Sequence, residues 1–364
     1  MKKKMALALS LAMAATTLAP AAVSAADEQV TLTIMSSIQT EDEGKLESAI
    51  ADAYMEQNPN VKIEFISVAN NDLDAQITTM AASDDLPDAF YMNCAFMSTA
   101  LDMGIVADSS KYISDEYKAD VLPEVLDYAT VDGNLMFIPW FQIPVALIYR
   151  TDWLEQAGID KIETMDDFRE AAKAFTDISG NYGFSMVGTR NGSGEARFSV
   201  YDKAYGVNEV YQNDSGEWES DLTSDNFKTA LESFVNLDLE DGRHVTNLQV
   251  SGYAITSTCE HPEEMAAYLE FAASYDNAVS FGSQTGRIPV TESALADEAF
   301  SGDEYTGFKD CMQYSIPYST FPGYAEVQDI MGEAYNSMLT GTSLEDAMAT
   351  VDSRITDLLA EYNK

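Results

Sequence analysis

The sequence predicts an α/β protein with more than one domain, and the order of its first elements is the main reason. Three expected strands, 29–35, 61–68 and 89–92, alternate with two expected helices, 41–58 and 72–83. Strands that alternate with helices predict a mostly parallel sheet with helices on both faces. The chain has 364 residues, which is enough for two domains of ordinary size.

Each of these elements has its own local signal. Strand 29–35 alternates apolar residues with Thr and is rich in β-branched side chains, a pattern typical of strands. In helix 41–58, Leu46, Ile50 and Tyr54 share one face, and an Asn-Pro pair ends the helix. Ligands of open parallel sheets bind at the carboxyl ends of the strands. We therefore expect the loops after the first and third strands to contribute to a site.

The rest of the chain is expected to be mostly helical. Val145–Tyr149 is a continuous apolar run, which predicts a strand buried on both faces. A short strand is expected at 252–256, and Ser343 is expected to cap the last helix. The remaining expected helices are 152–157, 165–176, 223–239, 262–273, most of 290–314 and most of 325–362.

The N-terminus has the pattern of an export signal. Lys2–Lys4 is positively charged, Met5–Ala19 is apolar, and Val23–Ala25 has the small residues that a signal peptidase reads. We expect residues 1–25 to be removed and the protein to be periplasmic or extracellular. An uncleaved anchor is the alternative, although the apolar run is short for a membrane span. No Cys follows this run, so we expect no lipid anchor.

The composition excludes several function classes. A net charge of −41 repels nucleic acid and anionic lipid, while it allows a cationic ligand. The cysteines, Cys94, Cys259 and Cys311, do not have the spacing of a metal site, and the chain has only two His. We therefore expect no metal and no cofactor. One disulfide could form among the three, which leaves at least one thiol unpaired.

Eight short phrases follow one another along the chain in the order of a known family. They are Asn58–Glu64, Ala82–Asp88, Asp132–Trp140, Leu147–Tyr149, Thr164–Phe168, Ser251–Ile255, Gly286–Val290 and Gly341–Ala347. Together they resemble the extracellular solute-binding proteins of ABC importers, in the branch that includes maltodextrin-binding members. The resemblance implies a monomeric, non-catalytic clamp of two lobes. It would close on a sugar or short oligosaccharide and deliver it to a membrane permease.

The resemblance also implies how the chain divides between the lobes. Each lobe would be a mostly parallel sheet flanked by helices, with three hinge crossings between the lobes. Residues 26–139 plus 254–317 would form lobe 1, and residues 140–253 plus 318–364 would form lobe 2. Family members usually carry further strands where this chain has only the short segment 240–250. Lobe 2 is therefore expected to be shortened, either by a natural trim or by an internal deletion.

A sugar needs aromatic planes for its C–H faces and polar side chains for its hydroxyls. Trp140 and Phe141 lie at the first implied crossing and are expected to line the cleft, with packing between the lobes as the alternative. The other candidates follow expected strands or lie near the other crossings: Tyr91, Asn93, Gln39, Glu41, Tyr253, Arg287 and Tyr324. Helix capping is the alternative for Gln39 and Glu41, and a salt bridge is the alternative for Arg287.

Three other functions remain open at this point. A secreted glycosidase would need two carboxylates at a fixed separation, and 61 acidic residues make any such pair unspecific. Neither a Gly-x-Ser-x-Gly elbow nor a His-Glu-x-x-His motif is present. The same fold could bind a polyamine or another cationic solute, as the acidic composition allows. The short segment 240–250 also allows an inactive remnant.

Overall fold

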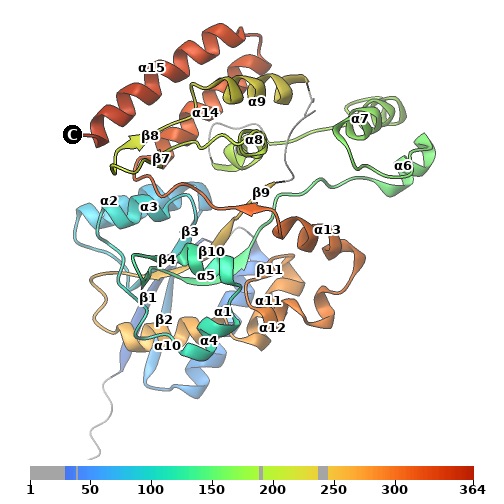
Figure 1. Cartoon of the computed structure of the whole chain (residues 1–364). Helices are drawn as coiled ribbons and strands as arrows, with labels where there is room; N and C mark the ends of the chain where they lie inside the picture. Colours follow the sequence, from blue (N-terminus) through green and yellow to red (C-terminus); the bar gives the residue numbers. More distant parts are fainter. Residues whose placement is uncertain (1–28, 38–39, 188–191, 237–244) are drawn as a thin grey trace, which may run out of the picture.

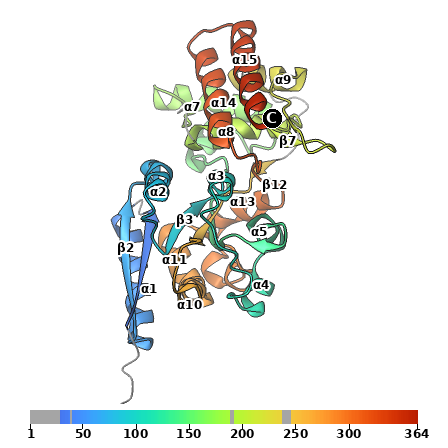
Figure 2. The same cartoon turned by 90° about the vertical axis from the view of Figure 1, so that its left-hand side faces the viewer.

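The computed structural model of the chain describes residues 29–37, 40–187, 192–236 and 245–364. The expected signal peptide, residues 1–25, lies outside these residues. Two parts are visible in both views, one built around a sheet and the other made mostly of helices (Figures 1 and 2). We call the described residues of 30–142 and 250–312 the sheet part. The described residues of 151–236 and 324–362 are called the helical part.

The sheet part contains six strands in the order β11-β6-β10-β3-β1-β2. Their bounds are β1 Val30–Ser37, β2 Val61–Val68, β3 Ala89–Asn93, β6 Ile138–Gln142, β10 Val250–Ile255 and β11 Ile288–Pro289. β1 pairs in parallel with β2 and β3, whereas β10 is antiparallel to β3 and β6, and β11 is antiparallel to β6. The sheet is thus mixed, although β1, β2, β3 and β6 point the same way.

The path of the chain explains the reversed strand in the middle of the sheet. β6 ends at the edge that faces the helical part, and the chain then enters that part. β10 returns from the helical part to the same edge, so it must run against its neighbours. The antiparallel strand was not predicted, because residues 140–253 were expected to belong to the other lobe.

Helices cover the sheet, and the first one shows how the sequence fixes its start. The Thr40 side chain accepts from the Glu43 N–H, and the Glu43 carboxylate accepts from the Thr40 N–H, which forms a capping box. The expected strands and helices of residues 29–92 are confirmed to within a few residues. The helices here are α1 Glu41–Gln57, α2 Leu73–Ala82, α3 Met97–Asp102, α4 Asp115–Asp120, α5 Pro123–Ala129, α10 Pro262–Ala272, α11 Tyr275–Thr285, α12 Glu292–Leu295 and α13 Asp303–Met312.

The helical part lacks an extended sheet among its described residues. Its helices are α6 Thr151–Ala157, α7 Met165–Ser179, α8 Gly192–Ala204, α9 Asp225–Asn236, α14 Tyr324–Leu339 and α15 Leu344–Tyr362. Ser343 caps α15, as expected. Only one pair of two-residue strands lies here, β7 Tyr211–Gln212 with β8 Trp218–Glu219. This part differs from the expected parallel sheet because the short connection from α9 to β10 leaves little chain for further strands.

The prediction of a buried strand at Val145–Tyr149 is wrong. These residues belong to no strand, and the exposed fractions of Leu147, Ile148 and Tyr149 are 45%, 80% and 43%. An apolar run becomes a buried strand only where neighbouring strands pair with its backbone. The described residues of the helical part supply no such neighbour.

Two cores of unequal size hold the molecule together. The main core extends from the sheet through Phe198, Phe227 and Tyr335 of the helical part. A separate small core of Leu154, Ala171 and Phe175 joins only α6 and α7. These two helices project beside α8 in Figure 1, away from α14 and α15. We call them the α6–α7 hairpin.

The expected lobe boundaries fall inside two strands of the sheet. Residues 139/140 lie within β6 and residues 253/254 lie within β10, and every residue of β6 and β10 is buried. The sheet therefore extends to Gln142 on the outward path and begins again at Val250 on the return. Near the junction, β9 Thr246–Asn247 pairs in parallel with β12 Ser315–Ile316, so two connecting segments lie side by side. Which residues move together as a lobe stays a prediction.

Candidate functional site

Five aromatic side chains from β3, β6, β10 and α11 meet in the sheet part, and we call them the aromatic cluster. They are Tyr91, Trp140, Phe141, Tyr253 and Phe281. Trp140 stacks on Phe281 with ring centroids 4.3 Å apart, and its centroid is 5.8 Å from that of Tyr253. Tyr91 lies 6.0 Å from Tyr253 and 6.3 Å from Phe141, centroid to centroid. Four of the nine predicted site residues are thus neighbours.

Strand pairing explains why these rings converge. β10 lies between β3 and β6, and its register against β6 shifts between Ser251 and Gly252. A Cβ at Gly252 would lie 2.0 Å from the Ile138 carbonyl oxygen, so the two backbones approach too closely for any side chain. Phe281 comes from α11 and was not predicted, because its helical position alone gives no sign of the strand it covers.

The aromatic cluster is packed rather than open. Trp140 and Phe141 are each 5% exposed, and Tyr91 and Tyr253 are equally buried. The ring partners of Trp140 and Phe141 are Tyr91, Tyr253 and Phe281, all of the sheet part, so the two side chains pack within one part and not between the lobes. The Trp140 Nε1–H is buried without a hydrogen-bond acceptor. Such an unsatisfied donor costs about 1–3 kcal/mol, a cost that an acceptor brought to it would remove.

The hydroxyl of Tyr253 is hydrogen-bonded to a buried carboxylate, that of Glu47. The Tyr253 hydroxyl donates to Glu47 Oε1 at 2.5 Å, and the Ser36 hydroxyl donates to Glu47 Oε2 at 2.5 Å. Burial raises the pKa of Glu47, and the hydrogen bonds from Ser36 and Tyr253 partly oppose that rise. The sequence showed Glu47 only as a polar residue in an amphipathic helix, so its role was missed.

Arg287 lies at the rim of the aromatic cluster. Its Nη2 and Nε are 2.7 Å and 3.1 Å from Glu43 Oε1. The guanidinium carbon is 5.1 Å from the centre of the Phe141 ring, within cation–π range. The side chains of Arg287 and Glu43 are 14% and 10% exposed. The salt bridge that was the alternative for Arg287 is therefore present.

The remaining candidates lie in three different settings. Asn93 is half-buried, donates to Asp74 Oδ1 at 3.1 Å and accepts from the Phe96 N–H at 3.0 Å. Burial raises the pKa of Asp74 to about 6, with the amide of Asn93 opposing the rise. Glu41 is exposed and pairs with Lys45. Gln39 lies outside the described residues.

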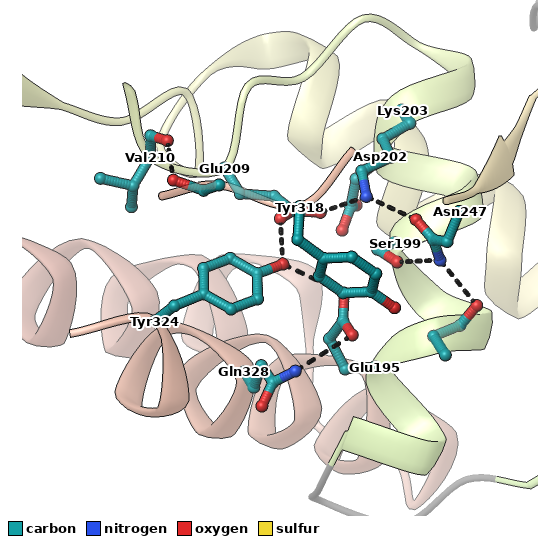
Figure 3. A network of polar contacts seen from close by, with 12 residues as sticks. Glu195, Ser199, Asp202, Lys203, Glu209, Val210, Asn247, Tyr318, Tyr324 and Gln328 are labelled. Carbon is teal, nitrogen blue, oxygen red and sulfur yellow. Dashed lines mark hydrogen bonds and ion pairs between the residues drawn. The ribbon is translucent and has the colours of Figure 1, made fainter. Parts of the chain in front are cut away.

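Tyr324 is not part of the aromatic cluster. It is fully buried in α14, where its hydroxyl contacts Glu195 and Glu209 in a polar network of the helical part (Figure 3). Two surface grooves are lined by none of the eight candidates that the structure describes. One has a volume of about 650 Å³ and runs along α7 past Tyr182, and the other, of about 890 Å³, lies between α4 and α10.

The described residues carry no sign of a metal centre. No group of three His, Cys, Asp or Glu side chains in them could hold a metal ion. Cys94, Cys259 and Cys311 are all unpaired. Within the same residues, no helix is both long and apolar enough to cross a membrane.

The sequence matches a family model across most of the chain. The model describes the bacterial extracellular solute-binding proteins and matches residues 37–279. This chain belongs to that family, whose members bind solutes, and the expected family resemblance is thereby confirmed.

Individual relatives are more distant. Lipoprotein LipO of Bacillus subtilis is 27% identical over 198 residues, which is 50% of this chain and 39% of LipO. Thiaminase-1 of Paenibacillus thiaminolyticus is 29% identical over 156 residues, which is 43% of this chain and 36% of the thiaminase. The chain thus spans well under half the length of the curated relatives it matches.

Solved structures confirm the two-lobed α/β fold. Maltose-bound MalE3 of T. maritima superposes with a TM-score of 0.77 at 18% identity, covering 90% of this chain and 100% of that one. The cyclic alpha-maltosyl-1,6-maltose binding protein of Arthrobacter globiformis gives 0.75 at 18% identity, covering 91% and 99%. At these identities the likeness concerns the fold.

Proposed function

We propose that this chain is the exported substrate-binding component of an ABC importer. It captures a sugar or short oligosaccharide between two lobes, leaves it chemically unchanged and delivers it to a membrane permease. Residues 1–25 direct export, and the protein acts as a monomer. Membership of the solute-binding family supports the class, and structural neighbours that hold maltose, maltotriose or maltotetraose support the ligand.

The observation that carries the ligand proposal is the rim formed by Phe141, Arg287 and Glu43. An aromatic ring, a fork of N–H donors and a carboxylate acceptor lie together at the carboxyl edge of the sheet. This is the mixture that a sugar requires, since its faces pack on rings and its hydroxyls both donate and accept. Asn93, at the end of β3, adds an amide at the same edge.

The candidate residues fall into a partly exposed group and a buried group, and we propose a different role for each. Arg287, Asn93 and Glu41 retain some exposure, and we propose that they meet the ligand first. Trp140, Phe141, Tyr91 and Tyr253 are buried against one another, so the ligand reaches them when the aromatic cluster opens at its rim. Gln39 follows the first strand and is proposed to contribute an amide. Tyr324 is proposed to act from the other lobe.

A cationic solute such as a polyamine is the second candidate. Three carboxyl groups, Glu43, Glu47 and Asp74, lie beside the aromatic cluster or the end of β3. Carboxylates and ring faces together attract an ammonium group. The thiaminase among the relatives is the reason to measure turnover alongside binding.

A thermal-shift screen tests the proposal. Maltose, maltotriose and spermidine are each added to the purified chain, and a ligand at a hundred times its Kd stabilises the folded state by about 2.7 kcal/mol. We expect a maltodextrin to raise the Tm and to be recovered intact. Arg287→Ala should abolish that shift, whereas Arg169→Ala, which removes an arginine of α7, should retain it.

Other outcomes would replace the proposal. A shift with spermidine alone would establish the cationic solute. Recovery of altered sugar would establish an enzyme. A cooperative melt that none of these compounds shifts would favour the inactive remnant.

A further inference from the structure

A second cluster of ionisable groups lies in the helical part, away from the aromatic cluster. Glu195, Asp202 and Lys203 come from α8, Glu209 follows α8, and Tyr324 comes from α14. All five side chains are buried, with exposed fractions of 5% or less. Figure 3 shows the polar contacts among them. The proposed function uses only Tyr324 among them, so the cluster needs its own explanation.

The Tyr324 hydroxyl contacts two carboxyl groups but has only one hydrogen to donate. Its hydroxyl oxygen is 3.2 Å from Glu195 Oε1 and is also in contact with Glu209 Oε2. A tyrosine hydroxyl has one hydrogen and can donate it to one carboxylate. If both carboxyl groups were ionised, the second would face a tyrosine lone pair. A proton on one of the two carboxyl groups removes this conflict, since that group can then donate.

The charge balance around the pair also favours an added proton. Lys203 is the one cation in the described cluster, and its Nζ is 3.9 Å from Glu209 Oε1. Asp202 is the third carboxyl group, and it accepts from the Tyr335 hydroxyl of α14 through one oxygen only. Three buried carboxylates against one ammonium leave two uncompensated charges, a costly arrangement in a buried setting.

We propose that Glu195, Tyr324 and Glu209 form a latch between α8 and α14 that is closed only while the two carboxyl groups share one proton. Loss of that proton places a second negative charge beside the first and weakens the contact between the helices. Gln328 of α14 donates to Glu195 Oε2 at 3.3 Å and Ser199 lies on the same α8 face, so the closed latch has neutral donors around it.

The latch is connected to the segments that join the two parts. The Tyr318 ring packs edge-on against Tyr324, with centroids 5.7 Å apart, and lies 4.5 Å from Lys203 Nζ. Gln249, just before β10, donates to the Tyr318 hydroxyl at 2.9 Å. Asn247 of β9 donates to Ser199 and accepts from Lys203. An opened latch therefore loosens the helical part where it meets the connecting strands.

The direction of the pH effect follows from burial and neighbouring charge. Burial, together with the negative charge of Glu209, raises the pKa of Glu195 to about 7, and Lys203, Ser199 and Tyr324 oppose the rise. Burial also raises the pKa of Asp202. Cys94 of the sheet part is the buried thiol that faces the latch, and burial raises its pKa as well. The pKa of Glu195 is higher in the folded chain than its ordinary value of 4.5, so the folded chain holds the proton more tightly than the unfolded chain does. The stabilisation that the shared proton gives to the folded state is therefore present at acid pH and is lost as the pH rises toward about 7.

The test compares thermal unfolding of the full chain with that of Glu195→Gln at about pH 5 and about pH 8. We expect the Tm of the unaltered chain to fall by about 5 °C over this range and that of Glu195→Gln to fall by less, while Glu47, Asp74 and Asp202, whose pKa values burial also raises, account for the fall that remains. Glu217→Gln removes an exposed carboxylate from the same part and should keep the fall. An unchanged pH dependence in Glu195→Gln would overturn the proposal.

A second measurement serves if Glu195→Gln does not fold. Carboxyl-labelled glutamate in the unaltered chain is titrated by NMR. A glutamate that titrates near pH 7, and whose pKa is higher still in Tyr324→Phe, supports the latch, because the Tyr324 hydroxyl opposes the rise. Titration of every glutamate at its ordinary pKa would contradict it.

Discussion

The sheet part and the helical part satisfy the hydrogen-bonding groups of their backbones in different ways. In the sheet part, β1, β3, β6 and β10 each pair with a neighbour on both sides, and helices cover their side chains. In the helical part, described backbone groups are satisfied mainly inside helices, and buried polar bonds such as Tyr335–Asp202 join them. A helix completes its hydrogen bonds alone, whereas a strand needs partners. The helices of the helical part therefore need no neighbouring strands. Val145–Tyr149 does need them, and because the described residues supply none, it forms no strand.

The largest expected effect concerns the buried charges of the helical part. Lys203→Met removes the cation beside Glu195, Asp202 and Glu209, and we expect a loss of about 3–5 kcal/mol in the free energy of unfolding. Urea unfolding at neutral pH measures it. Lys228→Met removes an exposed lysine that pairs with Asp225 on α9 and should cost less than about 0.5 kcal/mol. Equal losses in both variants would show that the network does not hold the helical part together.

A smaller effect distinguishes the two cores. Ile34→Ala opens a cavity in β1, where the side chain is fully buried, and should cost about 3 kcal/mol of global stability. Phe175→Ala empties the small core of the α6–α7 hairpin and should leave the unfolding of the sheet unchanged. Amide hydrogen exchange should then show loss of protection in α6 and α7 alone. A global loss in Phe175→Ala would mean that the hairpin unfolds together with the rest.

The smallest effect is expected at the exposed apolar run. Ile148→Ser should change the free energy of unfolding by no more than about 0.5 kcal/mol, because the side chain is 80% exposed. A loss of several kcal/mol would instead mean that Ile148 is buried in solution, as the sequence first predicted.

Local patterns were enough to predict the elements of residues 29–92 and the cap of α15. Alternation, capping residues and Pro act over a few positions, so they can be read from the sequence. The strand at Val145–Tyr149 failed because its burial depends on chain segments elsewhere. Phe281 and Glu47 were missed for the same reason, since each meets its partners only through packing between distant elements. Tyr91, Trp140, Phe141 and Tyr253 lie together because β10 pairs between β3 and β6, and neither this pairing nor their burial can be predicted from a local pattern.

Titration calorimetry with maltotriose, followed by analysis of the recovered sugar, measures whether the chain binds a sugar and leaves it intact. We predict saturable binding with one site per chain, intact sugar afterwards, and loss of the signal in Arg287→Ala. Absence of any binding heat at high sugar concentration, or recovery of cleaved sugar, would contradict this prediction.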